Sequence, residues 1–155
     1  MSRFIVGQCR FDKLDDLSAT LEGLFGAGSG ERSSNGTNQL SAFGYQGDSR
    51  DDEIGKVAAV VRRKWIGGAS NDLPVIQQPD GSYRIAISEY DVGAVPQRLH
   101  WKGTKSATDV ENRFRQVFAK NQMTRGLSSL GFKLTETTDK ESGEIHVVAR
   151  KYVGT

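Results

Sequence analysis

The spacing of apolar residues changes several times along this chain, and these changes of period limit its fold more than any other feature. Extended segments, in which apolar and polar residues alternate or a short apolar run occurs, cover residues 2–10, 40–45, 56–66, 73–78, 83–90, 132–138 and 145–153. Two segments instead repeat apolar residues at intervals of three and four, which is the period of one helix face; they cover residues 12–26 and 106–130. A chain that mixes both periods in this order is neither all helix nor all strand.

Two helices set among strands in the order β-α-β-β-(β)-β-α-β-β predict an α+β fold. We expect a mostly antiparallel sheet with both helices packed on one of its faces. The length of 155 residues suits one core, so residues 1–155 are predicted to form a single domain. Asp12 is expected to cap the first helix, Ser106 or Thr108 the second, and Gly131 to end the second.

Two segments interrupt the regular pattern. Residues 26–38 are rich in Gly, Ser and Asn and have little to bury, so they predict a flexible loop. Their glycines lack the Lys-Ser/Thr pair of a phosphate-binding loop and follow a helix, which argues against a phosphate site. Residues 91–104 contain Gly93, Pro96 and Gly103 and are predicted to be irregular.

Cysteine content and the N-terminal segment indicate a location. The single cysteine, Cys9, excludes an intrachain disulfide and fits a reducing compartment. The apolar stretch at residues 4–6 is too short for a signal peptide or a membrane span. We therefore expect a protein of the cytoplasm or of the plastid stroma, with no membrane partner.

No group of residues has the spacing of a metal or catalytic site. His100 and His146 show no ligand spacing with each other or with Cys9. The acidic residues 51–53 lack the alternating spacing and the turn glycine of a calcium loop. A nucleophile pair of Cys9 and His146 would require the first and last strands to be neighbours. We expect no metal and no cofactor, and the sequence favours a protein that is not an enzyme.

Basic and aromatic residues support an alternative hypothesis, in which the chain binds RNA or DNA. The residues that would contact the nucleic acid are Arg62, Arg63, Lys64, Trp65, Arg113, Arg115 and Lys120. Aromatic side chains stack on bases, and cations contact phosphates. The formal net charge of +2 is low for a phosphate-binding surface, so a normal solvated helix face explains the same residues.

A third hypothesis places a binding or catalytic site in the segment between the strong strand at 83–90 and the long helix. Its candidate residues are Tyr90, Asp91, His100 and Trp101. Irregular segments on a rigid scaffold commonly carry binding sites, and His100 would be the only candidate base. The alternative is that Trp101 simply packs over the helix.

The order of several motifs resembles a known family. The motifs are Ser2–Phe4, Phe43–Arg50, Pro79–Tyr83 followed by Tyr90–Asp91, and Leu130–Leu134. They resemble the family typified by the hypothetical chloroplast reading frame thirty-five (Ycf thirty-five) of red-algal plastids and cyanobacteria, which has bacterial relatives. The resemblance spans nearly the whole chain, which departs from the family in its loop at 26–38 and its longer segment at 93–103.

This resemblance implies an accessory or adaptor role. The family is not known for catalysis, and its bacterial members are often encoded beside AAA-type ATPases. A protein partner, with an ATPase as the first candidate, is therefore the leading expectation. The resemblance brings no set of functional residues with it.

Overall fold

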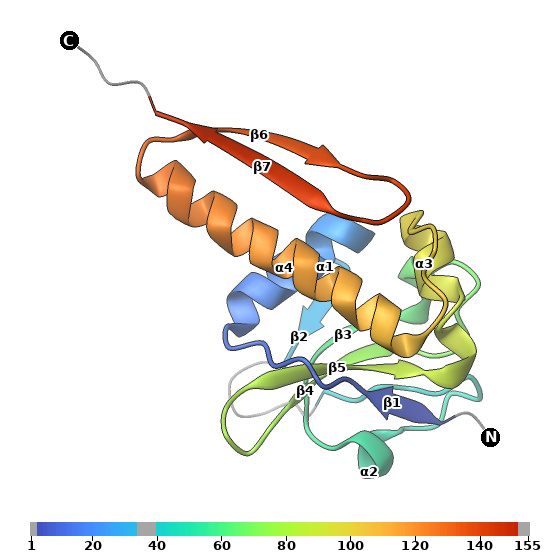
Figure 1. Ribbon diagram of the computed structural model, residues 1–155. Helices are drawn as coiled ribbons and strands as arrows, with labels where there is room; N and C mark the ends of the chain where they lie inside the picture. The colour runs from blue at the N-terminus through green and yellow to red at the C-terminus, as the bar shows by residue number, and fades with distance from the viewer. Residues whose placement is uncertain (1–2, 34–39, 152–155) are drawn as a thin grey trace.

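The computed structural model describes residues 3–33 and 40–151 and arranges them in layers (Figure 1). A five-stranded antiparallel sheet has the strand order β1-β5-β4-β3-β2, and a two-stranded sheet is formed by β6 and β7. The strands are β1 (Phe4–Val6), β2 (Gly30–Arg32), β3 (Val57–Val61), β4 (Leu73–Gln77), β5 (Tyr83–Ser88), β6 (Lys133–Thr138) and β7 (Ile145–Arg150). The helices are α1 (Leu14–Phe25), α2 (Asp51–Ile54), α3 (Ala94–Leu99) and α4 (Ala107–Ser129), with short 3-10 helices η1 (Arg63–Trp65) and η2 (Glu89–Asp91).

Both faces of the five-stranded sheet are covered, and each has its own core. Helices α1 and α4 lie on one face, where the buried residues are Phe11, Leu17, Leu21, Phe25, Ala59, Val61, Ile66, Leu73, Val75, Ile85, Ile87, Val95, Val110, Phe114 and Phe118. The segment 40–54, which includes α2, covers the other face, where the buried residues are Phe4, Ala42, Ile54, Val57, Val60, Ile76 and Ala86. All five residues of β3 are buried because the strand contributes to both cores.

The predicted fold class is confirmed. The fold is α+β, the sheet is antiparallel, and the two long helices pack on the same face. Helix α4 begins where the sequence indicates, because Ser106 and Asp109 form a reciprocal capping box. Gly131 follows the helix with a φ of 86°, a conformation that glycine adopts without steric cost. The first helix starts later than predicted, with Lys13 and not Asp12 at its N-cap.

Four predictions of strands and loops need correction. The predicted strand at 56–66 ends at Val61, and Arg63–Trp65 form the 3-10 helix η1. The predicted flexible loop at 26–38 contains an edge strand, β2, which pairs with β3. Residues 40–45 do not form a ladder, because only Phe43 makes a bridge, to Ser49. The first strand covers only Phe4–Val6 of the predicted 2–10. Residues 2, 34–38 and 152–153, on which other parts of these predictions fall, lie outside the described residues.

Two further differences concern how elements are placed. The last two strands form a separate hairpin that packs on α4, so it forms a layer beyond the helices and leaves the main sheet with five strands (Figure 1). The segment 91–104, predicted to be irregular, contains helix α3 over Ala94–Leu99. Pro96 is compatible with this helix because it lies in the first turn, where its missing N–H is tolerated. Across the part of the chain that the structure describes, no helix is long and apolar enough to cross a membrane.

Candidate functional site

The structure sorts the residues singled out from the sequence into two places. Arg62 and Arg63 belong to the loop that connects β3 to β4, Asp91 accepts hydrogen bonds from that loop, and Tyr90 precedes Asp91 in the chain. His100, Trp101, Arg113 and Lys120 line a groove between α4 and the β6–β7 hairpin. Neither place unites all the residues of one sequence hypothesis, since each contains members of two.

A buried carboxylate organises the first place. Asp72 directly precedes β4 and is only 5% exposed. It accepts hydrogen bonds from the backbone N–H groups of Arg63 and Phe43, at 2.9 and 3.0 Å. The guanidinium of Arg62 is its third donor, at 2.9 Å. A buried charge is tolerated only when it is paired and hydrogen-bonded, and Asp72 meets both conditions.

A second buried acid extends this network. Asp91 accepts the backbone N–H groups of Ser70 and Asn71, at 2.8 and 2.9 Å, and the side-chain amide of Asn71 at 3.2 Å. The amide oxygen of Asn71 in turn accepts the N–H of Tyr45, at 3.1 Å. The buried acid after Tyr90 is thus connected to the backbone of Tyr45 through one side chain. Asp91 is accounted for as a structural group in this network.

Arg62 connects the network to an aromatic ring. Its guanidinium pairs with Glu31 at 2.9 Å and also donates to the carbonyl of Ser41 at 2.7 Å. Burial lowers its pKa, but the hydrogen bonds with Glu31 and Asp72 outweigh burial and raise the pKa above its ordinary value. The same guanidinium lies 5.2 Å from the centre of the Phe43 ring, which is a cation–π distance.

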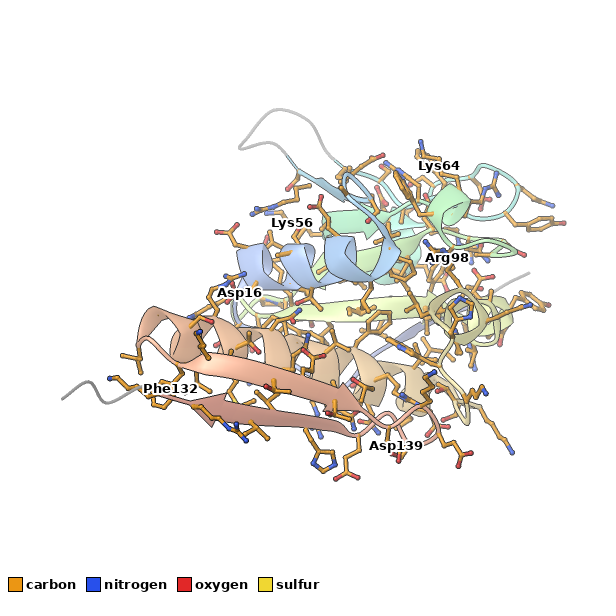
Figure 2. The ribbon with its side chains drawn as sticks, turned by 90° about the horizontal axis from the view of Figure 1, so that it is seen from above. Asp16, Lys56, Lys64, Arg98, Phe132 and Asp139 are labelled. Atoms are coloured by element: carbon orange, nitrogen blue, oxygen red, sulfur yellow. The ribbon has the colours of Figure 1, made fainter. Side chains whose placement is uncertain are left out.

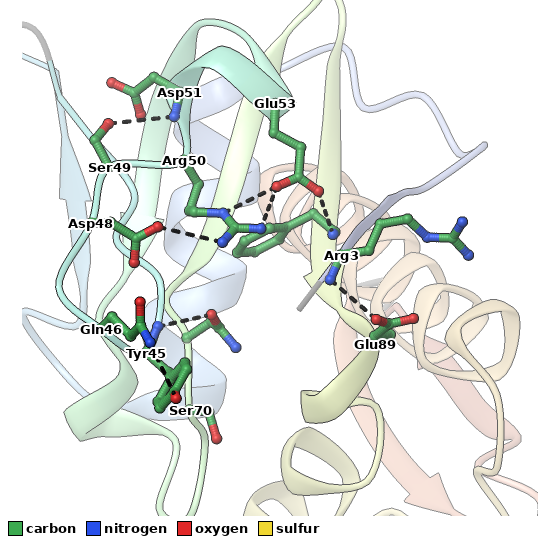
Figure 3. Close-up of polar contacts among 12 residues, drawn as sticks. Arg3, Tyr45, Gln46, Asp48, Ser49, Arg50, Asp51, Glu53, Ser70 and Glu89 are labelled. Carbon is green, nitrogen blue, oxygen red and sulfur yellow. Dashed lines mark hydrogen bonds and ion pairs between the residues drawn. The ribbon is translucent and has the colours of Figure 1, made fainter. Parts of the chain in front are cut away.

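The segment 40–54 is held by its own set of charges (Figure 3). Arg50 is buried and lies between Asp48 and Glu53, with ion-pair distances of 3.4 and 2.5 Å. Glu53 also accepts the N–H of Phe4 at 2.8 Å, which ties the segment to strand β1. Desolvation raises the pKa of Glu53, but the hydrogen bond from Phe4 and the Arg50 guanidinium lower it by a larger amount. The net pKa of Glu53 is therefore below its ordinary value.

Three exposed aromatic side chains stand on this buried polar framework. Phe43 is 39% exposed, Tyr45 60% and Tyr90 65%. We refer to Phe43, Tyr45 and Tyr90 as the aromatic rim. The backbone N–H groups of Phe43 and Tyr45 are fixed by Asp72 and Asn71, so an ordered segment presents these two rings, while Tyr90 stands in η2, next to the buried Asp91. Apolar rings displayed in this way are suited to contact with another molecule.

The second place is a groove of about 290 Å³ with mixed polarity. Trp101 packs edge-on against Phe114 at 5.1 Å, so its packing role is the one observed. Arg113 donates to the carbonyls of Lys102 and Glu141, and Lys120 pairs with Glu136 at 3.2 Å. These cations already bind groups of the protein, so fewer of their N–H donors are available to phosphates.

The remaining predicted nucleic-acid residues do not complete a surface with these groups. Trp65 is half-buried against the larger core, and its carbonyl accepts the guanidinium of Arg98 at 2.9 Å. Lys64 is exposed and its ammonium lies 6.0 Å from the Trp65 ring (Figure 2). Arg115 is exposed on α4, so it lies on a different element from the Arg62–Trp65 segment.

The catalytic candidates considered from the sequence are not supported by the arrangement of the described residues. Burial, followed by the hydrogen bond with Glu111, raises the pKa of the Cys9 thiol to about 11, so the thiol is protonated at neutral pH. Cys9 and His146 are not on neighbouring strands, because β1 pairs with β5 and β7 pairs with β6. Among residues 3–33 and 40–151, no cluster of His, Cys, Asp or Glu is suited to hold a metal ion.

Sequence reasoning missed Phe43, Tyr45, Asn71 and Asp72 as site residues. A weak signal existed, because Asn71 and Asp72 follow two glycines between strands, and Asx side chains there commonly accept backbone N–H groups. Burial of the Asp72 carboxylate has no sequence signature.

Comparisons with known proteins do not assign this chain to a family. A scan against protein-family models finds no match, and searches of the curated proteins and of the solved structures find no similar protein.

Proposed function

We propose that this chain is an accessory domain that binds another protein through the aromatic rim and performs no chemistry of its own. The observation that carries the proposal is the display of Phe43, Tyr45 and Tyr90 on a buried polar framework. Tyrosine and phenylalanine are enriched where proteins meet, and a preordered segment loses little entropy on binding.

We propose an AAA-type ATPase as the partner, in the cytoplasm or the plastid stroma. The support is the resemblance to the Ycf thirty-five family and the gene neighbours that it implies. Two rim residues, Phe43 and Tyr45, belong to the Phe43–Arg50 motif that contributes to the resemblance. The same motif also contains Arg50, whose ion pairs secure the segment against the sheet.

The test is a co-purification from the source organism with a tagged chain. The wild-type chain is expected to enrich an AAA-type ATPase, and a variant with Phe43→Ser and Tyr45→Ser is expected to lose it. Both side chains are exposed, so the double variant should stay folded, with a loss of about 0.5–1 kcal/mol because Phe43 gives up its cation–π contact with Arg62.

Leu130→Ser is the matched control, since Leu130 is another exposed apolar residue, located just after α4. It should retain the ATPase. The proposal fails if no ATPase is enriched by the wild-type chain, or if the double variant retains the ATPase as well as the control does.

A further inference from the structure

Strand β7 carries a long unpaired edge. It has six residues and, among the described residues, pairs on one side only, with β6. The edge strands of the main sheet, β1 and β2, have only three residues each. In Figure 2, β6 lies on the side of α1, whereas no described element lies beyond β7. An unpaired strand edge is a template for another strand unless a proline, a bulge or a covering element blocks it.

The hairpin geometry shows which backbone groups of β7 are free to pair. The N–H of Asp139 donates to the carbonyl of Glu144, so this pair is hydrogen-bonded. Hydrogen-bonded and non-bonded pairs alternate along an antiparallel ladder. His146, Val148 and Arg150 therefore direct their backbone groups toward β6. Ile145, Val147 and Ala149 direct theirs toward the open edge.

An apolar groove lies beside this edge. It has a volume of about 310 Å³ and is lined by Gln116, Ala119, Lys120 and Met123 of α4 and by Glu144, Ile145 and Val147. No residue of β6 lines it, so it belongs to the β7 side of the hairpin. Met123 is 47% exposed there, which leaves a large apolar side chain without cover.

We propose that a second copy of this chain occupies this edge, with the two β7 strands antiparallel about a two-fold axis at Val147. In this register Ile145 lies opposite Ala149 of the other copy, and the outward groups form about six hydrogen bonds. On the solvent face, Glu144 lies opposite Arg150 of the other copy, twice by symmetry. The opposite charges favour this register, because a shift by two residues places Arg150 opposite His146 instead.

The spacing of the layers is compatible with this arrangement. Adjacent strands are about 4.8 Å apart, so the centres of two paired hairpins lie about 10 Å apart. Helices pack at 8–10 Å, so the two copies of α4 beneath the four-stranded sheet meet at a normal packing distance. The groove beside each β7, with Met123 and Ala119, then faces the other copy and is covered.

Charge reversal tests the register, with molar mass measured by light scattering on the purified full chain. At about 100 μM the wild-type chain is expected at twice its mass of 17.0 kDa. Glu144→Arg alone or Arg150→Glu alone places like charges opposite each other, and each should raise the dimer dissociation constant about tenfold. The double exchange restores opposite charges and should restore the dimer.

Lys56→Glu is the matched control, because Lys56 is an exposed cation next to β3 of the main sheet, outside the hairpin, and takes the same change of charge. It should leave the dimer intact. Hydrogen exchange adds a backbone readout: the amides of Ile145, Val147 and Ala149 should gain protection as concentration rises. The proposal would be overturned if the wild-type chain is monomeric at this concentration, or if Arg150→Glu leaves the dimer dissociation constant unchanged.

Discussion

Removing the charge of Asp72 tests whether the buried network holds the aromatic rim. All three groups that surround its carboxylate are donors, namely two backbone N–H groups and the Arg62 guanidinium. Asp72→Asn keeps the shape of the side chain but replaces one acceptor oxygen by an NH₂ group, which then faces a donor. Oδ1 accepts one bond, from Arg63, and Oδ2 accepts two, from Phe43 and Arg62. One or two of the three bonds are therefore lost or become repulsive, depending on which way the amide turns, and the negative charge that pairs with Arg62 is lost in either case.

The magnitude follows from the number of bonds. Hydrogen bonds to charged groups contribute about 1.5–3 kcal/mol each, and breaking a buried ion pair costs about 3–5 kcal/mol. Arg62 retains Glu31 and the carbonyl of Ser41, which places the expected loss near the lower end, at about 3 kcal/mol. For a chain of this size that loss lowers the melting temperature by about 6–12 °C.

Urea and thermal unfolding followed by circular dichroism measure this loss. Asp52→Asn is the matched control, because Asp52 is an exposed acid of the α2 segment, and its unfolding curve should coincide with that of the wild type. Hydrogen exchange at the Phe43 amide should accelerate in Asp72→Asn only. A loss below about 1 kcal/mol would refute the reasoning that Asp72 is the centre of the network.

Three other predictions concern separate parts of the molecule. Gly143→Ala should cost about 1 kcal/mol more in unfolding free energy than Gly81→Ala: both glycines have positive φ, but only at 143 does the added Cβ displace the Arg113 guanidinium. The lowered pKa of Glu53 means that its stabilising effect is complete above its ordinary value of 4.5 and is lost as pH falls through the folded value, so Glu53→Gln should flatten the acid limb of a stability–pH curve. Alkylation of Cys9 in the folded chain should rise with pH toward an apparent pKa of about 11, and a plateau near pH 8 would contradict the burial of the thiol.

Elements with local signals were predictable, and elements made by pairing were not. The bounds of helix α4 could be predicted from Ser106 and Gly131, because an N-cap and a C-terminal glycine depend on neighbouring residues alone. Strand β2 has no such signal: Gly30-Glu31-Arg32 shows no apolar alternation, and it is a strand because β3 offers a free ladder. Its assignment to a flexible loop followed from composition, which carries no information on pairing.

The candidate site was hidden from the sequence for a related reason. Asp72 and Asp91 resemble ordinary turn acids, and only the tertiary fold buries them among backbone N–H groups. Arg62 and Arg63 looked available for phosphates because a sequence shows charges without their partners. Tyr90 and Asp91 were predicted to belong to one binding segment, yet the Asp91 side chain accepts hydrogen bonds inside the protein from Asn71 while Tyr90 remains exposed.

The two proposed surfaces have a joint consequence, because they lie on different sides of the molecule. The segment 40–54, which carries Phe43 and Tyr45, covers the outer face of the main sheet, and the hairpin forms the layer beyond α4 (Figure 1). Pairing through β7 therefore leaves both rims uncovered, so the dimer is bivalent toward a multimeric partner. Two linked sites bind more tightly than one through effective concentration, without any new contact. Arg150→Glu should then weaken capture of a multimeric partner while leaving each rim intact, whereas Phe43→Ser with Tyr45→Ser should abolish capture in monomer and dimer alike.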